Sequence, residues 1–460
     1  MEIYMEISNY RIVMPKAPGH TERRAATFLQ TQIRMVRGVK LPIVTDETTP
    51  CDYEFVIGRT TREAYDGVVF NRQIDTPWEF VIKTVGTRVY LTGMGALDTE
   101  PKPYTSGYTL MYDNANGTAH AVYRYVEDVL GYNFSYLDWD GAPEYDELDV
   151  PEYNFSFTRE LLRKQEVELF DGTAMYSMLS PETINWNNLC IIFKTKAGKL
   201  VVIDGGRPDN TERLLSTLER LSGGKKPVVE AWFLSHLHSD HYGPLLNITR
   251  DESLRERVTI KNFYHKLLPA KYYNLFPAPK NETWEKICGD LLSTENLPET
   301  NHVLVNTGDR VVVDELTFDV IHAPYYKDMF EMNINDSSVV IRVDYNNGEQ
   351  GIMLLGDAEH VCSNDMTENF SDKLKSEVVF VGHHGCGNVS RECYEMIGAD
   401  VYIWPTCARN WYGDNSEGPH THNIGILRTR TYMKDRGIKN ENIYRDSFEI
   451  QSFKLPIEIK

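Results

Sequence analysis

The stretch Ser235–His241, with the sequence Ser-His-Leu-His-Ser-Asp-His, constrains this chain more than any other feature. It places three histidines and one aspartate within six positions, directly after the apolar run 227–234. Such a run predicts a buried strand. Polar side chains packed this densely at the end of a buried strand need partners, and a divalent cation is the natural one. The alternative interpretation is a His-rich loop on the surface.

The spacing within this stretch predicts two adjacent metal positions. His236 and His238 are two residues apart, so on extended backbone both imidazoles point the same way, toward a first position. Asp240 and His241 are expected where the chain turns before the next helix, and there they can face a second position beside the first. One short loop is therefore predicted to serve one or two divalent cations.

The charge balance disfavours one class of partner. The chain has 460 residues, with 48 Lys+Arg and 67 Asp+Glu, which gives a formal net charge of -19. A protein that binds nucleic acid through phosphates usually carries the opposite sign, although a local basic groove or bound metals can override the overall charge. The seven cysteines are scattered without a C-x-x-C pair, so they do not indicate a disulfide framework.

The sequence also bears on location. It has no run of eighteen apolar residues, so no transmembrane helix is expected. The first residues lack the basic region and apolar core of a signal peptide. We therefore expect a cytoplasmic protein, or a secreted one if a leader has been removed. The sequence does not specify the oligomeric state.

The order of segments predicts two domains. Residues 1–155 have the pattern of a separate α/β unit, and residues 132–160, rich in Tyr, Asp, Glu and Pro, are interpreted as a linker. Residues 160–460 contain many β segments with a few interposed helices. This second pattern favours two sheets faced by helices over a simple parallel sheet.

Further polar phrases provide candidate site residues. Asp204 leaves a strand before two glycines and can accept hydrogen bonds from ligating histidines, with an ordinary turn as the alternative. Asp357 follows an apolar strand, where a carboxylate needs compensation, and is the candidate to bridge two cations. His383 and His384 are adjacent and point differently, so one is expected to ligate metal and the other to face substrate. His420, in a Gly- and Asn-rich loop, is a candidate to stabilise developing charge, with a solvated loop as the alternative.

In order and context, these phrases resemble the metallo-β-lactamase superfamily over residues 160–425. The resemblance implies an αββα sandwich, here preceded by a smaller α/β domain, with a mono- or dinuclear site at one edge of the two sheets. Carried over by position, it places His236 and His238 at the first metal, Asp240, His241 and His383 at the second, Asp357 between them and Asp204 in support.

The sequence departs from this pattern at the third histidine of the first metal. Many members carry it between the His-rich loop and the bridging aspartate. His322 ends a strand in that region, but it precedes Asn333–Val340, a phrase that resembles the hydrolase domain of ComEC-type competence proteins. In that subgroup an Asn/Ser phrase replaces the histidine. His322 is therefore disfavoured as a ligand, and the first position is expected to be weak or completed by water.

Residues 1–155 resemble the small non-catalytic N-terminal domain of α-glucuronidases, hexosaminidases and related glycan-active enzymes. The phrases that carry this resemblance are Phe55–Gly58, Val89–Gly93 and Ala121–Gly131. The resemblance implies a glycan-associated accessory domain. The alternative is an unrelated α/β domain, because likeness of fold does not fix function.

The predicted function is that of a metal-dependent hydrolase, foremost a phosphodiesterase acting on a small phosphodiester or a glycoconjugate. The nitrogen and oxygen ligands suit zinc first, with manganese or iron as alternatives. Such a centre would use a metal-bound hydroxide, oriented by Asp240, with His384 or His420 stabilising the developing charge. The alternatives are a ComEC-like nuclease, a lactonase or thioesterase, and a non-catalytic glycan-binding protein with a structural metal site.

Overall fold

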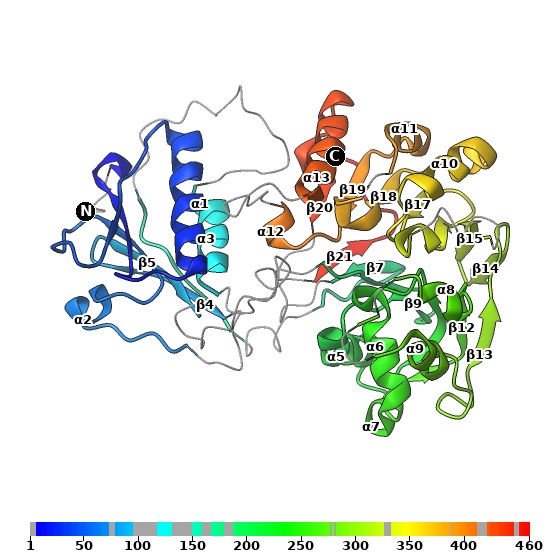
Figure 1. Ribbon diagram of the computed structural model, residues 1–460. Coiled ribbons are helices and arrows are strands. Elements are labelled where there is room, and N and C mark those ends of the chain that lie inside the picture. The colour runs from blue at the N-terminus through cyan, green and yellow to red at the C-terminus, as the bar shows by residue number, and fades with distance from the viewer. Residues whose placement is uncertain are drawn as a thin grey trace. The chain divides into compact units, whose positions relative to one another are not determined.

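The computed structural model describes residues 6–72, 79–94, 117–130, 150–158, 167–178, 187–276, 278–279, 282–325, 333–387, 389–411, 421–445 and 450–460 (Figure 1). The chain divides into two units. The first consists mainly of Met1–Lys164, and the second of Gln165–Pro181, Trp186–Cys407 and Thr421–Lys460. Within the described residues, none of the helices has the length and apolar character needed to cross a membrane.

The first unit is built on a six-stranded sheet in the order β2-β1-β3-β5-β4-β6. β4 and β5 form an antiparallel hairpin, and β6 pairs with the other edge of β4. The predicted boundary at residue 155 falls inside β6, so this sheet extends to Phe157. The elements are η1 (Ile7–Asn9), β1 (Arg11–Met14), α1 (His20–Arg37), β2 (Ile43–Thr45), β3 (Glu54–Ile57), α2 (Arg62–Asp66), β4 (Phe80–Val85), β5 (Arg88–Gly93), α3 (Gly117–Asp128), β6 (Asn154–Phe157) and, later in the chain, α12 (Ala408–Trp411).

The second unit contains two sheets. One has eight strands in the order β13-β12-β10-β9-β8-β7-β21, with β11 paired to β10, and the other has seven in the order β14-β15-β16-β17-β18-β19-β20. The elements are β7 (Ala174–Ser177), β8 (Cys190–Lys194), β9 (Leu200–Asp204), η5 (Pro208–Asn210), α5 (Thr211–Leu221), β10 (Val228–Leu234), α6 (Ser239–Arg250), α7 (Glu252–Arg255), β11 (Thr259–Ile260), β12 (Asn262–His265), α8 (Ala270–Tyr273), α9 (Trp284–Leu291), β13 (Asn301–Leu304), β14 (Arg310–Val313), β15 (Leu316–His322), η7 (Asn335–Ser337), β16 (Val340–Tyr345), β17 (Gln350–Leu354), α10 (His360–Asn369), η8 (Ser371–Lys373), β18 (Val378–Phe380), η9 (Gly382–Gly385), α11 (Arg391–Ile397), β19 (Val401–Trp404), α13 (Thr421–Asp435), η10 (Asn440–Asn442), β20 (Ile443–Arg445) and β21 (Gln451–Lys454).

Strand β9 shows how an apolar run builds this layered unit. Leu200 and Val202 belong to the core shared with helices α5, α6 and α9. Val201 and Ile203 belong to the core between the two sheets. Because successive side chains of a strand point to opposite faces, a strand that is apolar throughout needs cover on both faces. Figure 1 shows α10, α11 and α13 along the second sheet, which completes the αββα order and confirms the predicted fold class.

The His-rich stretch differs from expectation in one respect. β10 ends where predicted, but α6 begins directly after His238, which is its N-cap residue with extended backbone (φ -107°, ψ 148°). Asp240 and His241 therefore lie in the first helical turn and not in a turn before the helix. Gly243 fixes this turn against the loop after β9, since a Cβ there would lie 2.2 Å from the backbone nitrogen of Pro208.

Helix α11, which follows the His383–Gly385 turn, is capped by Ser390. The Ser390 hydroxyl accepts a hydrogen bond from the backbone N–H of Cys393 at 3.1 Å. We expect Ser390→Ala to lower the free energy of unfolding by about 1 kcal/mol, because that N–H loses its partner. Urea denaturation measures the change, with the exposed Ser371→Ala as control. Equal midpoints for Ser390→Ala and the wild type would contradict the prediction.

Candidate metal centre

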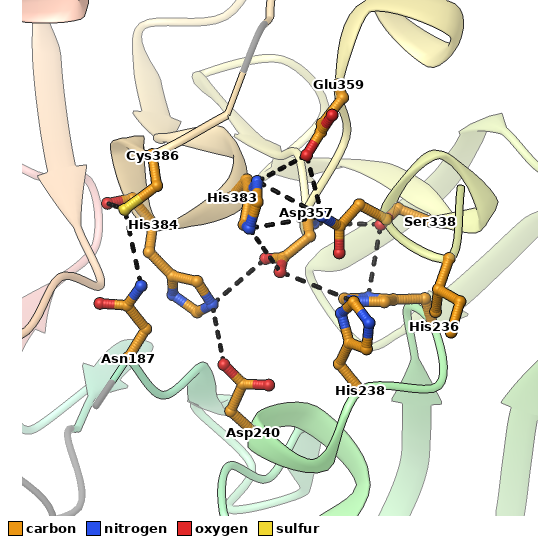
Figure 2. Close-up of polar contacts among 12 residues, drawn as sticks. Asn187, His236, His238, Asp240, Ser338, Asp357, Glu359, His383, His384 and Cys386 are labelled. Atoms are coloured by element: carbon orange, nitrogen blue, oxygen red, sulfur yellow. Dashed lines mark hydrogen bonds and ion pairs between the residues drawn. The ribbon is translucent and has the colours of Figure 1, made fainter. Parts of the chain in front are cut away.

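Four segments that follow strands bring the candidate residues together (Figure 2). β9 ends at Asp204, and β10 leads into the His236–His241 stretch. In the second sheet, Asp357 follows β17, and the pair His383–His384 follows β18. β9 and β10 are neighbours in one sheet, and β17 and β18 are neighbours in the other. The site is therefore built from the carboxyl ends of adjacent strands in both sheets.

The buried carboxylate of Asp357 lies at the middle of this site (Figure 2). Its Oδ1 is 3.2 Å from His241 Nε2 and 3.3 Å from His384 Nε2. Its Oδ2 is 3.6 Å from His236 Nε2 and 3.9 Å from His383 Nε2. Each carboxylate oxygen thus faces two imidazole nitrogens, which is the arrangement that a carboxylate shared by two cations requires.

Two of these histidines are held from behind through Nδ1. His241 Nδ1 lies 2.8 Å from Asp204 Oδ2, and His384 Nδ1 lies 2.7 Å from the carbonyl oxygen of Pro405. A partner on Nδ1 fixes the tautomer and the ring orientation, so that Nε2 points at the metal. Histidines that ligate metals almost always carry such a partner.

Asp204 also organises the segment after β10. Its fully buried carboxylate accepts hydrogen bonds from the Ser235 N–H at 2.7 Å and from the Ser235 hydroxyl at 2.9 Å. The same hydroxyl lies 3.0 Å from His236 Nδ1. Asp204 has left-handed backbone (φ 61°), a conformation that costs free energy and that is concentrated at functional sites. One carboxylate thus orients His241 directly and His236 through Ser235.

The other side chains of the His-rich stretch face the same space. His238 Nδ1 lies 3.1 Å from His236 Nε2, and Asp240 Oδ2 lies 3.4 Å from His384 Nε2. In three groups of described residues, one donor atom from each residue lies within 4.8 Å of the others. Two groups lie around Asp357: His236, His241 and Asp357, and Asp240, His241 and His384. The third is Asp336, Glu359 and His360.

The residues present fit a divalent cation. Among the described residues, His241 Nε2, His384 Nε2 and Asp357 Oδ1 are buried and lie within ion-pair distance, but their geometry makes no hydrogen bond. Native proteins rarely leave such atoms unsatisfied. Burial disfavours a charged His241, but the carboxylates of Asp357 and Asp204 outweigh it and raise its pKa well above the ordinary value. Burial likewise opposes charge on His384, yet Asp357 and Asp240 raise its pKa to about 9. The carboxylates therefore favour positive charge here, as a cation site requires.

The adjacent histidines of η9 take different places from those expected. His384 is 1% exposed and faces Asp240, whereas His383 is 17% exposed and its Nδ1 lies 2.8 Å from Glu359 Oε1. Both have left-handed backbone, with φ of 47° and 54°. This tight turn directs the second imidazole inward. The structure therefore brings His384 beside Asp240 and His241, where the sequence-based assignment placed His383. Metal ligation by either histidine stays a prediction.

Three residues at the site were not found from the sequence. The Ser338 hydroxyl accepts a hydrogen bond from the backbone N–H of Asp357 at 3.0 Å. Asn335 donates to Glu359 at 2.9 Å. Ser338 and Asn335 belong to the Asn/Ser phrase that the sequence did single out, so its position before a strand was the available signal. Glu359 carried no signal except its place two residues after Asp357.

His322 contacts residues outside this group of side chains. His322 Nδ1 is 3.2 Å from the Cys362 thiol sulfur, and its Nε2 is 3.4 Å from Asp365. These contacts occupy both ring nitrogens of His322. His420 lies outside the described residues.

Comparison with protein families adds to this geometry. Residues 185–317 match the metallo-beta-lactamase superfamily. The matched segment includes Asp204 and the whole His236–His241 stretch. No curated protein matches the chain.

Several solved structures are similar to this chain at low identity. The metallo-beta-lactamase fold protein YhfI from Bacillus subtilis is 10% identical, with a TM-score of 0.36 over 62% of this chain and 99% of that chain. CmlA, a diiron beta-hydroxylase from Streptomyces venezuelae, is 12% identical, with a TM-score of 0.35 over 63% of this chain and 55% of that chain. Unliganded yeast PDE1 is 13% identical, with a TM-score of 0.35 over 60% of this chain and 98% of that chain.

Proposed function

We propose that the second unit is a metal-dependent hydrolase that acts on phosphodiesters. The observation that carries the proposal is the convergence of imidazole Nε2 atoms on both oxygens of the buried Asp357. The family match of residues 185–317 supports it. Bound divalent cations supply a Lewis acid and lower the pKa of water, so that hydroxide is available at neutral pH.

The proposal assigns each side chain a task. Nitrogen and oxygen donors suit zinc first, and manganese or iron as alternatives. The proposed ligands are His236 and His238 at the first position, Asp240, His241 and His384 at the second, and Asp357 at both. Asp204 holds His241 and the segment around it, as its hydrogen bonds indicate.

Asp240 is the proposed residue that touches the nucleophile. Its side chain is 20% exposed, whereas those of His384 and Asp357 are 1% and 2% exposed. A carboxylate at the open side can accept a hydrogen bond from the attacking water and hold it toward the phosphorus. The burial of His384 favours ligation over the charge-stabilising role first considered for it. His420 keeps that role only as a prediction from the sequence.

The substrate class follows from charge and from the resemblances. A net charge of -19 disfavours a long polyanion, which favours a small phosphodiester. The likeness of residues 1–155 to accessory domains of glycan-active enzymes favours a phosphodiester carried on a glycoconjugate. The Asn333–Val340 phrase keeps a ComEC-like nuclease as the second candidate, because two of its residues contact the site: Ser338 contacts Asp357, and Asn335 contacts Glu359.

We expect the zinc-loaded protein to hydrolyse bis(p-nitrophenyl) phosphate and to lose this activity with a chelator. His238→Ala is expected to lower kcat/KM roughly 100-fold, because a weakened cation site stabilises the transition state less. Release of p-nitrophenol measures the rate, and Glu368→Ala, which changes an exposed side chain of α10, is the control. Equal rates for wild type and His238→Ala would contradict the proposal.

The same assay panel separates the alternatives. Single-stranded DNA tests the nuclease, and a lactone and a thioester test the remaining hydrolases. Faster metal-dependent turnover of DNA than of the small diester would identify a nuclease. Turnover of the lactone without turnover of any phosphodiester would move the reaction to a carbonyl centre. Metal binding without turnover of any of these substrates would favour a non-catalytic glycan-binding protein with a structural metal site.

A further inference from the structure

We propose that His383, oriented by Glu359, is the third nitrogen ligand of the first position, beside His236 and His238. This inference rests on the metal centre proposed above and names the missing nitrogen ligand of its first position. The superfamily histidine expected there has no counterpart in His322, whose ring nitrogens face Cys362 and Asp365.

The four imidazoles around Asp357 divide into two pairs. His383 and His236 direct Nε2 toward Oδ2, at 3.9 Å and 3.6 Å. His241 and His384 direct Nε2 toward Oδ1, at 3.2 Å and 3.3 Å. Two ligands of one tetrahedral zinc lie about 3.4 Å apart, given metal–ligand distances near 2.1 Å. The separations on the Oδ2 side, 3.6 Å and 3.9 Å, are slightly longer than this value, and on that basis we place a cation beside His236, His383 and Asp357.

Glu359 holds His383 as Asp204 holds His241. Glu359 Oε1 lies 2.8 Å from His383 Nδ1, and Asp204 Oδ2 lies 2.8 Å from His241 Nδ1. In each pair the carboxylate accepts a hydrogen bond from Nδ1–H, and Nε2 is the nitrogen on the side of Asp357. His383 Nε2 also lies 3.3 Å from Asn335 Nδ2. A carboxylate behind the imidazole is the recurring partner of a metal-bound histidine. The two pairs approach Asp357 from different oxygens, so they serve different positions.

The Asn-rich phrase holds Glu359 in place. Asn333 Nδ2 donates to Glu359 Oε2 at 3.0 Å, and Asn335 Nδ2 donates to Glu359 Oε1 at 2.9 Å. Asp336 Oδ1 accepts a hydrogen bond from the backbone N–H of Glu359 at 3.2 Å. Three residues of one segment therefore fix both carboxylate oxygens and the backbone of Glu359. The phrase that stands where a ligand histidine is expected thus supports a histidine from another segment.

The left-handed turn at His383 and His384 explains why these two histidines face different oxygens of Asp357. Two consecutive residues with positive φ send neighbouring imidazoles to opposite oxygens of Asp357 (Figure 2). Such strain persists where the surrounding structure enforces it and is concentrated at functional sites. One short turn then supplies one ligand to each position.

Metal content and Co²⁺ spectra test this assignment independently of turnover. Full-length protein is loaded with Co²⁺ or Zn²⁺ and desalted, and the metal per chain is measured by mass spectrometry; two ions are expected. His383→Ala is expected to keep one ion and to lose about half of the Co²⁺ d–d absorption, because Asp240, His241 and His384 stay intact. His384→Ala is expected to lose the other ion, so its remaining Co²⁺ spectrum differs from that of His383→Ala.

Glu359 is a positioning residue, and its variants have a graded readout. In Glu359→Gln the amide oxygen can still accept a hydrogen bond from His383 Nδ1, so we expect affinity for the ion at the first position to fall about 10-fold. Glu359→Ala is expected to lower it about 100-fold, with the other ion unaffected. A purely structural role would weaken both ions equally. Glu368→Ala removes an exposed carboxylate from α10 and is expected to bind both ions normally.

Several results would overturn the assignment. These are two ions of wild-type affinity in His383→Ala, loss of an ion in Glu368→Ala, or a wild type that holds fewer than two ions. Circular dichroism of each metal-free variant checks folding, and Glu359→Gln decides if His383→Ala does not fold. A wild type that binds two ions yet hydrolyses none of the substrates contradicts the proposed function and leaves this assignment standing, so the two failures are distinguishable.

Discussion

Asp357→Ala is expected to bind neither cation and to lose kcat/KM by at least about 1,000-fold. Oδ1 of this carboxylate faces His241 and His384, and Oδ2 faces His236 and His383, so its removal opens both positions at once. A catalytic metal supplies several kcal/mol of transition-state stabilisation. Since each 1.36 kcal/mol corresponds to a factor of ten in rate, about 4 kcal/mol gives the stated loss.

Metal content and hydrolysis of bis(p-nitrophenyl) phosphate measure this effect together. Asp372→Ala is the matched control, because it removes an exposed carboxylate from η8. This variant is expected to keep both ions and full activity. A folded Asp357→Ala protein that retains two ions, or a tenth of the wild-type rate, would show that this carboxylate does not join the two positions.

The local pattern of the sequence is sufficient for most of the second unit's fold. Strands such as β9 and β17 are buried throughout, and an apolar run of that length in the sequence predicts a buried strand. Residues that carry chemistry lie at or shortly after the ends of these strands: Asp204 is the last residue of β9, and Asp357 follows β17 by three residues. This local rule located the His236–His241 stretch and both aspartates, because a polar residue at the end of a buried strand needs a partner.

The rest of the site depends on contacts that no local pattern contains. The choice between His383 and His384 is set by two left-handed residues, and neither is a glycine that would reveal positive φ. The turn is pressed against Trp404, where a Cβ on Gly385 would come within 2.1 Å of the indole ring. Likewise, Asn335 and Glu359 are 24 residues apart and meet only because the strands between them fold back.

Asp204→Ala is expected to lower the free energy of unfolding of the metal-free protein by about 3–5 kcal/mol. The carboxylate is fully buried and bonds to Ser235 and to His241 Nδ1. Removing it leaves buried donors and a buried imidazole without their partner, which costs far more than a surface pair. Urea denaturation measures the change. The control Glu230→Ala breaks a partly exposed pair with Lys261 and is expected to cost less than about 1 kcal/mol.

Asp204→Asn separates this structural role from metal binding. The amide oxygen can still accept from the Ser235 N–H, so the expected loss of stability is smaller, about 1–3 kcal/mol. Its NH₂ group, however, faces His241 Nδ1, and two donors cannot bond to each other. His241 must then carry its proton on Nε2, the atom that faces Asp357, and a protonated nitrogen cannot ligate a cation. Affinity for the ion that His241 ligates should fall about 10–100-fold in competition with a chromophoric chelator. Unchanged affinity in the folded variant would show that His241 does not ligate through Nε2.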